Sequence, residues 1–189
     1  MQPRPSNSSG TIDDATLDIA ARMFVMARHG DAAGLRASLS GTSPSSASPS
    51  TTSPVNLRDH KGDSLLMVAA YHGHTTAVDI LLTHGADPDI RNHHGQTAIA
   101  GAAFKGHVEV VESLLRHGAN VEGSSPEGQT ALMIAAMFNR TEIVSLLLAH
   151  GANIRARSNN GSTAIEAATA LNAPDTVAIL AEHLAKTPP

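Results

Sequence analysis

The feature that most constrains this chain is a sequence pattern that repeats every 33 residues. Single glycines recur at this interval at Gly62, Gly95, Gly128 and Gly161, and a His-Gly-Ala triplet recurs from His84, His117 and His150. A fixed period of this length is typical of solenoids, in which each unit is too small to bury its own apolar face and stacks on its neighbours. The 189 residues therefore predict a stack of about five units.

Each unit is predicted to contain two helices joined by a tight turn. In the first complete unit, the apolar segment 65–70 predicts a helix of about two turns, and Gly73 supplies the left-handed backbone that follows it. The equivalent turn residues are Gly106, Asn139 and Asn172. The second helices carry two apolar ladders, formed by Val78, Val111, Val144 and Val177 and by Leu81, Leu114, Leu147 and Leu180. These helices are predicted to end at Gly85, Gly118 and Gly151.

The two ends of the chain are divergent copies of the same unit. Gly30 corresponds to Gly73, but a Ser/Pro/Thr-rich stretch inserts about ten residues between these two turns. At the other end, Glu166, Glu182 and Lys186 add the polarity expected of a unit that closes a stack. The predicted boundaries are a disordered N-terminus over 1–10, an N-terminal capping repeat over 11–40, an inserted loop over 41–54, regular repeats over 55–90, 91–122 and 123–155, and a C-terminal capping repeat over 156–186.

Composition excludes several other classes of protein. There is no cysteine, which removes disulfides and thiolate-bound zinc. No apolar run approaches the ~20 residues that span a bilayer, and the polar N-terminus shows no secretory signal. The net charge of −4 argues against nucleic acid as the direct partner. We therefore expect a monomeric protein of the cytoplasm, with the nucleus as the alternative, that binds neither membrane nor nucleic acid directly.

The sequence also lacks the motifs of common catalytic sites. It contains no phosphate-binding Gly-rich loop, no Gly-x-Ser-x-Gly elbow and no His-Glu-x-x-His helix. The acidic residues are scattered over predicted helix faces rather than paired in one apolar cleft. We expect no enzymatic activity and no cofactor.

The repeat resembles the ankyrin repeat, a β-turn followed by two antiparallel helices in each 33-residue unit. The segments that carry this resemblance are Gly-Gln-Thr-Ala-Ile at 95–99, Ala-Ala-Phe-Lys-Gly-His at 102–107 and Leu-Leu-Arg-His-Gly-Ala-Asn at 114–120, and 128–153 contains a further copy. The resemblance implies an all-α ankyrin-repeat solenoid of about five helix-turn-helix repeats linked by β-turn or hairpin loops. The chain looks like the small stand-alone ankyrin proteins of bacteria and fungi.

The family's Thr-Pro-Leu-His opening is altered in every unit. Leucine or alanine replaces the proline at Leu65, Ala98, Ala131 and Ala164, and other residues replace the histidine at Met67, Ala100, Met133 and Glu166. The side-chain hydrogen bonds that this opening makes between neighbouring repeats are therefore not expected here, at some cost in stability. The fold itself does not depend on them.

The resemblance places the β-turn tips and the ends of the first helices on a concave face. The residues that directly precede each turn glycine or asparagine are Arg28, His29, Tyr71, His72, Phe104, Lys105, Met137, Phe138 and Leu171. The turn tips contribute His60, Lys61, Asp63, His93, His94, Gln96, Glu127, Gln129 and Asn160. Aromatic and methionine side chains beside arginine and lysine are typical of interface hot spots, so these residues are predicted to bind a partner protein.

The predicted binding residues change in character along the stack. The basic residues Arg28, His29, His72 and Lys105 come first, and the apolar residues Met137, Phe138 and Leu171 follow. A ligand with an acidic end and an apolar end would match this gradient. In the alternative interpretation, Tyr71, Phe104 and Met137 only fill gaps between adjacent helices, and the tips are solvated loops.

Five of the eleven histidines have a structural interpretation. His84, His117 and His150 precede helix-ending glycines, where the ring can bond terminal carbonyl groups. His74 and His107 follow turn glycines and are part of the repeating framework. Four others are left as candidate metal ligands, as a metal sensor would require: His60, His72, His93 and His94. We favour no metal there, and instead a mild pH sensitivity of binding.

The inserted loop contains Ser-Pro pairs every five residues, at Ser43, Ser48 and Ser53. These serines are candidate phosphorylation sites, and phosphates there would add negative charge beside the basic end of the predicted groove. The alternative, which we favour, is a low-complexity linker without a regulatory role, since long surface loops cost little free energy.

Together these patterns predict a non-catalytic protein–protein interaction module. It would act as an adaptor, an inhibitor or a chaperone-like escort that binds a protein partner on its concave face. The alternative is a nuclear regulatory subunit that acts on transcription through a partner protein, and entry into the nucleus distinguishes the two hypotheses.

Overall fold

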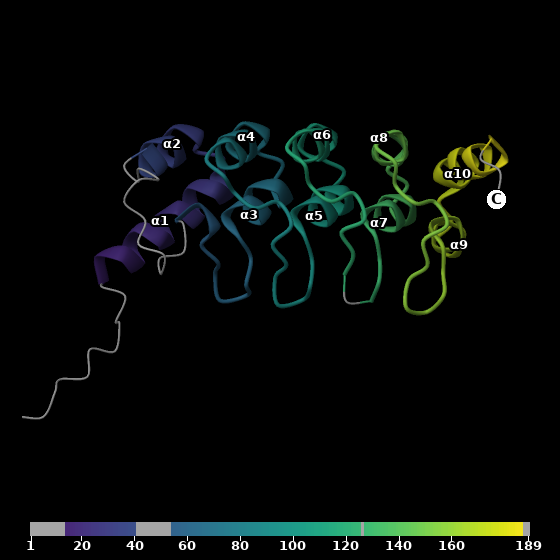
Figure 1. Ribbon diagram of the computed structural model, residues 1–189, viewed down its shortest axis with the longest axis horizontal. Coiled ribbons are helices and arrows are strands. Elements are labelled where there is room, and N and C mark those ends of the chain that lie inside the picture. The colour runs from purple at the N-terminus through teal and green to yellow at the C-terminus, as the bar shows by residue number, and fades with distance from the viewer. Residues whose placement is uncertain (1–13, 41–53, 126, 187–189) are drawn as a thin grey trace, which may run out of the picture.

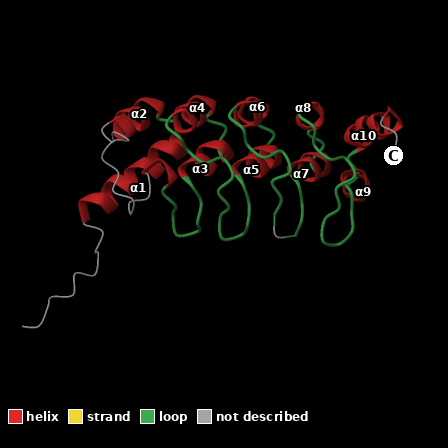
Figure 2. Cartoon of the chain, in the orientation of Figure 1, coloured by secondary structure: helices red, strands yellow, loops and turns green. Residues whose placement is uncertain are grey.

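The computed structural model describes residues 14–40, 54–125 and 127–186, in which pairs of antiparallel helices stack side by side (Figure 1). The first helices of the pairs form what we call the inner row: α1 (Asp14–His29), α3 (Leu65–Tyr71), α5 (Ala98–Lys105), α7 (Ala131–Met137) and α9 (Ala164–Ala170). The second helices form the outer row: α2 (Ala32–Ser40), α4 (Thr75–Thr83), α6 (Val108–Arg116), α8 (Thr141–Ala149) and α10 (Pro174–Lys186). Hairpin loops extend from the inner row, away from the outer row (Figure 2).

This arrangement confirms the predicted all-α repeat solenoid. Successive inner helices pack on one another, and each also packs on the outer helix of its own pair. The described residues contain no β-strand, and the hairpin loops show only two isolated bridges, between Arg58 and Ser64 and between Ser124 and Thr130. A short 3-10 helix, η2 (Pro54–Asn56), precedes the first of these loops and buries Val55.

The predicted apolar ladders of the outer row lie in the core. Leu81, Leu114, Leu147 and Leu180 are completely shielded from solvent, as are Val78, Val111 and Val144. Val177, in α10, is only partly buried, because no helix of the described residues follows to cover it. Full burial of one such side chain stabilises the fold by about 1.5–3 kcal/mol, so the ladders are a main source of stability.

Alanine takes the corresponding place in the inner row. The alanine pairs of successive inner helices are fully buried: Ala69, Ala70, Ala102, Ala103, Ala135 and Ala136. Side chains this small let neighbouring helices approach closely, which explains how a core with only four aromatic residues can be well packed.

The turns within each pair adopt the predicted left-handed backbone. Gly73 has φ +79°, and Asn139 and Asn172, at equivalent places, both have φ +54°. Asparagine tolerates this region better than other side chains do, which is why it can replace glycine here.

The altered opening motif still caps α3, α7 and α9, whereas Thr97 makes no side-chain cap at α5. Ser64 and Thr130 accept hydrogen bonds from the amides of Met67 (3.1 Å) and Met133 (3.3 Å), which cap α3 and α7. Both methionines are buried and fill the core where the family has histidine.

Other side chains link the repeats. A His74 ring nitrogen donates to the carbonyl of Arg28 (2.8 Å), and one repeat later a His107 ring nitrogen donates to the carbonyl of Tyr71 (3.2 Å). Arg140 continues the series by donating to the carbonyl of Phe104 (3.3 Å). A second series of hydrogen bonds joins the loops that follow the outer helices. In one of them, the side chain of Asp89 accepts from the amide of Asn120 (2.9 Å). Neither series depends on the family's opening motif.

Several sequence predictions fall outside the described residues. These are the disordered N-terminus over 1–10 and the candidate phosphorylation sites Ser43, Ser48 and Ser53. Across the ranges that are described, no helix is both long and apolar enough to cross a membrane.

Candidate binding groove

A hollow of about 480 Å³ opens where the first inner helices meet the first two hairpin tips. It brings together eight of the residues that the sequence singled out: Arg28, His60, Lys61, Asp63, Tyr71, His72, His94 and Gln96. We call this hollow the basic cavity. It is built from α1, α3 and α5 and from the tips that precede α3 and α5, so it forms only when three repeats stack.

Gly101 forms part of the wall of the basic cavity, and sequence reasoning missed it. It lies in the middle of α5, opposite the Tyr71 ring, where an added Cβ would sit 3.7 Å from a ring carbon. Glycine inside a helix costs about 1 kcal/mol relative to alanine. The sequence signal that could have identified Gly101 is a glycine inside a predicted helix, where no turn requires one.

The two carboxylates of the basic cavity are held by hydrogen bonds from the protein itself. Asp59 accepts from the amides of Lys61 (2.8 Å) and Asp63 (2.9 Å), which shapes the first tip. Asp63 in turn accepts from the side-chain amide of Asn92 (2.7 Å) in the next tip. These hydrogen bonds to the two carboxylates hold the hairpin tips in place.

The electrostatic environment of His72 is positive. Partial desolvation lowers the pKa of His72 below its usual value, and the nearby charges of His74, Arg28, Lys105 and His29 lower it further. The permanent charges that act on this ring are thus two cations, Arg28 of α1 and Lys105 of α5.

The three aromatic residues of the predicted binding face are partly buried and partly exposed. Tyr71, Phe104 and Phe138 retain 42%, 39% and 40% of their surface. Lys105 Nζ lies 5.1 Å from the centre of the Tyr71 ring, and the Phe104 and Phe138 rings meet edge to face with centres 4.6 Å apart. Each of the three therefore presents an apolar surface to solvent.

A second hollow, of about 220 Å³, lies at the other end of the inner row between α7, α9 and the last tip. Four predicted residues contribute to it: Gln129, Met137, Asn160 and Leu171. We call it the apolar cavity, because methionine, leucine and alanine side chains form much of its wall and no lysine or arginine does. Leu171 is 51% exposed at its edge.

Glu166 is the carboxylate of the apolar cavity, and it too is held internally. Hydrogen bonds from the backbone and hydroxyl of Thr163 lower the pKa of Glu166, and Arg157 lies 3.6 Å away. The resulting capping box fixes the start of α9.

The structure does not gather every predicted residue into a cavity. Phe104, Lys105 and Phe138 lie on the surface between the two, and we call the whole surface, both cavities included, the groove. His29 and Glu127 lie at the margins of the groove. The His29 ring bonds the carbonyl of Val25 (2.8 Å) within α1, and Glu127 lies on the tip before α7.

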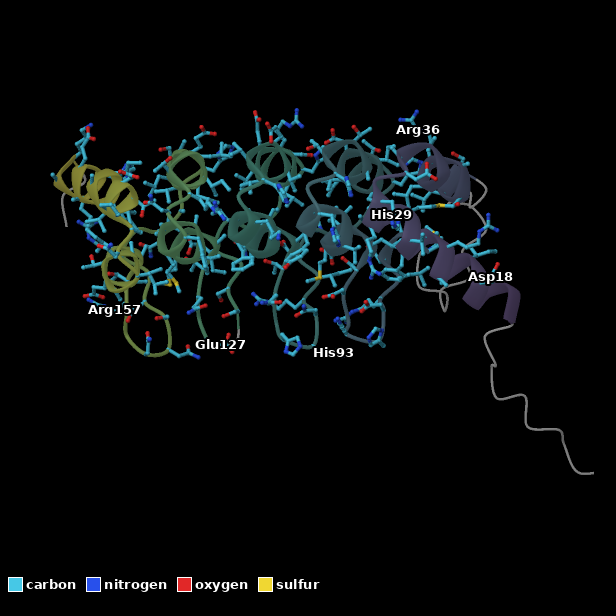
Figure 3. All side chains as sticks on the ribbon, turned by 180° about the vertical axis from the view of Figure 1, so that it is seen from behind. Asp18, His29, Arg36, His93, Glu127 and Arg157 are labelled. Atoms are coloured by element: carbon cyan, nitrogen blue, oxygen red, sulfur yellow. The ribbon has the colours of Figure 1, made fainter. Side chains whose placement is uncertain are left out.

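His93 was predicted to join this face but does not line the basic cavity. Its amide donates to the Lys61 carbonyl (3.0 Å), and its ring covers Gly62 of the preceding tip. In Figure 3 it lies at the far end of a hairpin loop, as does Glu127. The link to Lys61 directs this ring toward the neighbouring tip, whereas His94 lines the cavity.

The three histidines that precede helix-ending glycines contact the protein backbone. The rings of His84, His117 and His150 each bond the carbonyl four residues earlier, at 2.8–2.9 Å, as their position before a helix-ending glycine predicts. Within the described ranges no three His, Cys, Asp or Glu side chains are grouped as a metal ion requires, although His60, His72 and His94 share one cavity.

Comparison with known proteins agrees with this architecture. The family model for ankyrin repeats (3 copies) matches residues 23–125 and 120–188. A protein of Pseudomonas aeruginosa that is named as an ankyrin repeat protein is 48% identical over 76 residues, which are 40% of this chain and 36% of that relative. The chain thus spans about a third of that relative's length. With the family model matched over most of its length, and with the stacked helix pairs described above, this chain belongs to the ankyrin repeat family.

Proposed function

We propose that the chain is a non-catalytic protein-binding module and that its partner lies along the groove. Ankyrin repeats are generally protein–protein interaction modules. The observation that supports this proposal most strongly is the row of half-exposed apolar side chains, Tyr71, Phe104, Phe138 and Leu171, on a face whose supporting alanines are fully buried. Aromatic side chains of this kind are the usual anchors of protein interfaces.

The groove is also held in a fixed shape before any partner binds. Hydrogen bonds join its hairpin tips, for example from Asn92 to Asp63 and from the Asn159 amide to the Glu127 carbonyl (2.9 Å). A surface that is already ordered loses little conformational entropy on binding, which favours affinity. The role that fits such a surface is that of an adaptor, an inhibitor or a chaperone-like escort, acting as a monomer in the cytoplasm.

The test is affinity purification from the cells of origin, with the partner identified by mass spectrometry. Wild type is compared with the variant Tyr71→Ala/Phe104→Ala/Phe138→Ala, whose fold is checked by circular dichroism. We expect a specific protein that wild type retains and the variant loses, because truncation of central aromatic anchors typically removes 2 kcal/mol or more of binding free energy each.

A matched control removes apolar atoms from the opposite side of the molecule. Val108, Leu146 and Ile179 line a hollow between outer helices, and the variant with alanine at all three should retain the partner. Equal retention of the partner by the groove variant and by wild type would show that another surface binds it. Loss in both variants would point to lost stability rather than to a contact.

A further inference from the structure

We propose that the groove recognises an extended acidic segment of its protein partner, with carboxylate side chains in the basic cavity and an apolar side chain in the apolar cavity. This inference rests on the proposed function and adds the chemistry of the ligand to it. It is carried by the different composition of the two cavities, which lie at opposite ends of one row of helices (Figure 1).

The basic cavity gathers cations from separate parts of the chain. Arg28 comes from the end of α1 and Lys61 from the first tip, while Lys105 lies beside the cavity over the Tyr71 ring. All three side chains are exposed and form no ion pair at salt-bridge distance in the described residues. Two carboxylates, Asp59 and Asp63, accompany these three cations, so the local balance is still positive in a protein whose net charge is −4.

The carboxylates of Asp59 and Asp63 offset part of this field, which is therefore most positive beside His72, where Arg28 and Lys105 act on the ring. Asp59 and Asp63 already accept hydrogen bonds from the tips that they shape. At His72 the permanent charges that act on the ring are both cations, Arg28 and Lys105. A carboxylate that enters here meets donors and positive charge, which strengthens its binding and steers its approach.

The apolar cavity offers the opposite environment. Its edge is formed by Met137 and the 51% exposed Leu171, and its carboxylate, Glu166, is already bonded to Thr163. A leucine or phenylalanine of the partner would bury apolar surface there, whereas an acidic side chain would find no lysine or arginine in the wall.

The helix spacing sets the length of such a ligand. Packed helices lie about 8–10 Å apart, so the two to three repeats between His72 and the Phe138–Leu171 region correspond to about 20–30 Å. An extended peptide advances by about 3.3–3.6 Å per residue. The acidic residues and the apolar residue of the ligand should therefore be separated by about six to nine positions.

The test uses a phage library of random peptides of about 16 residues, long enough to span both cavities. The library is selected on the full chain, and enriched peptides are then synthesised and their affinities measured. We expect Asp and Glu to cluster about six to nine positions from a Leu, Met or Phe. Arg28→Glu/Lys105→Glu should weaken these peptides by at least about tenfold, and raising the salt concentration should weaken wild-type binding more than binding by the variant.

Two comparisons make the result specific. Arg36→Glu makes one charge reversal of the same kind on the exposed surface of α2, far from the hairpin tips (Figure 3), and should leave affinity unchanged. A short DNA duplex tests the other class of polyanion. If DNA bound as tightly as the acidic peptides and with the same dependence on Arg28 and Lys105, the groove would be a general polyanion site and the peptide assignment would be wrong.

The remaining outcomes separate this inference from the proposed function. Peptides that need Tyr71, Phe104 and Phe138 but carry no excess of acidic residues would overturn the acidic ligand and leave a protein-binding groove. Peptides that bind equally well to the aromatic triple variant, or a selection that enriches nothing, would count against both.

Discussion

The outer row and the groove differ in how their residues change from one repeat to the next. In the outer row the same residue returns in each repeat, and Leu81, Leu114, Leu147 and Leu180 are all fully buried. In the groove the equivalent positions differ, since His72, Lys105, Phe138 and Leu171 follow one another and remain exposed. Stability depends on positions that repeat, because every pair must bury the same face. Binding can depend on positions that vary, because nothing in the fold determines what they must be.

The largest loss of stability should come from replacing a leucine of the outer-row ladder. Leu114→Ala leaves a cavity between helices and should lower the free energy of unfolding by about 2–5 kcal/mol, measured by urea denaturation. Leu171→Ala removes the same atoms from a half-exposed side chain and should change stability by less than about 0.5 kcal/mol while weakening partner binding. If the two losses of stability were similar, the separation between the outer row and the groove would be wrong.

A smaller effect is expected at the turns, where two glycines with almost the same backbone have different surroundings. Gly73 has φ +79°, and an added Cβ would lie 2.7 Å from the His107 ring. Gly151 has φ +82° and open space around it. Gly151→Ala should cost only the left-handed backbone strain, about 1–2 kcal/mol. Gly73→Ala should cost clearly more.

The additional cost at Gly73 would identify the link between repeats. To accommodate the methyl group the His107 ring must move, which disturbs its bond to the carbonyl of Tyr71 (3.2 Å). The double variant Gly73→Ala/His107→Ala should therefore be less destabilised than the sum of its single changes. Strict additivity in thermal or urea unfolding would show that the contact between turn and histidine is not strained.

The helix caps allow a third comparison, between one structural position in two repeats. Thr130 accepts a hydrogen bond from Met133 and caps α7, whereas the Thr97 hydroxyl, at the start of α5, is buried and has no partner in the described residues. Thr130→Val should cost about 1 kcal/mol of unfolding free energy. Thr97→Val removes an unsatisfied polar group and should be neutral or stabilising. Equal losses would show that both hydroxyls cap their helices in solution.

The features of the fold and the groove that could be predicted from the sequence are those that recur in every repeat. The 33-residue period predicted the helix pairs, the ladders and the left-handed turns at Gly73 and Asn139, because each is a local requirement that every repeat satisfies. It could not predict that His94 lines the basic cavity while His93 lies against the preceding tip. That difference depends on one backbone bond between repeats, from His93 to Lys61, which leaves no mark in the sequence.

The smallest predicted effect concerns the charge of the groove itself. Desolvation and the cations around His72 hold its pKa below the usual value, so its neutral form is favoured in the folded protein. The folded state then binds fewer protons at this site than the unfolded chain does. The stability that His72 contributes is therefore fully present at pH values above the pKa of this ring in the unfolded chain. It is lost as the pH falls from that value to the lower pKa of the ring in the folded protein.

The titration of the His72 ring, followed by NMR, tests the positive field directly. Arg28→Glu and Lys105→Glu should each raise its midpoint, and Arg36→Glu on α2 should not. An acidic peptide in the basic cavity should raise it as well, because a carboxylate favours the protonated ring. By linkage the same peptide must then bind more tightly as pH falls toward the pKa of bound His72. A midpoint indifferent to both charge reversals would mean that desolvation alone acts on this histidine, and the basic cavity would lose its electrostatic distinction from the apolar one.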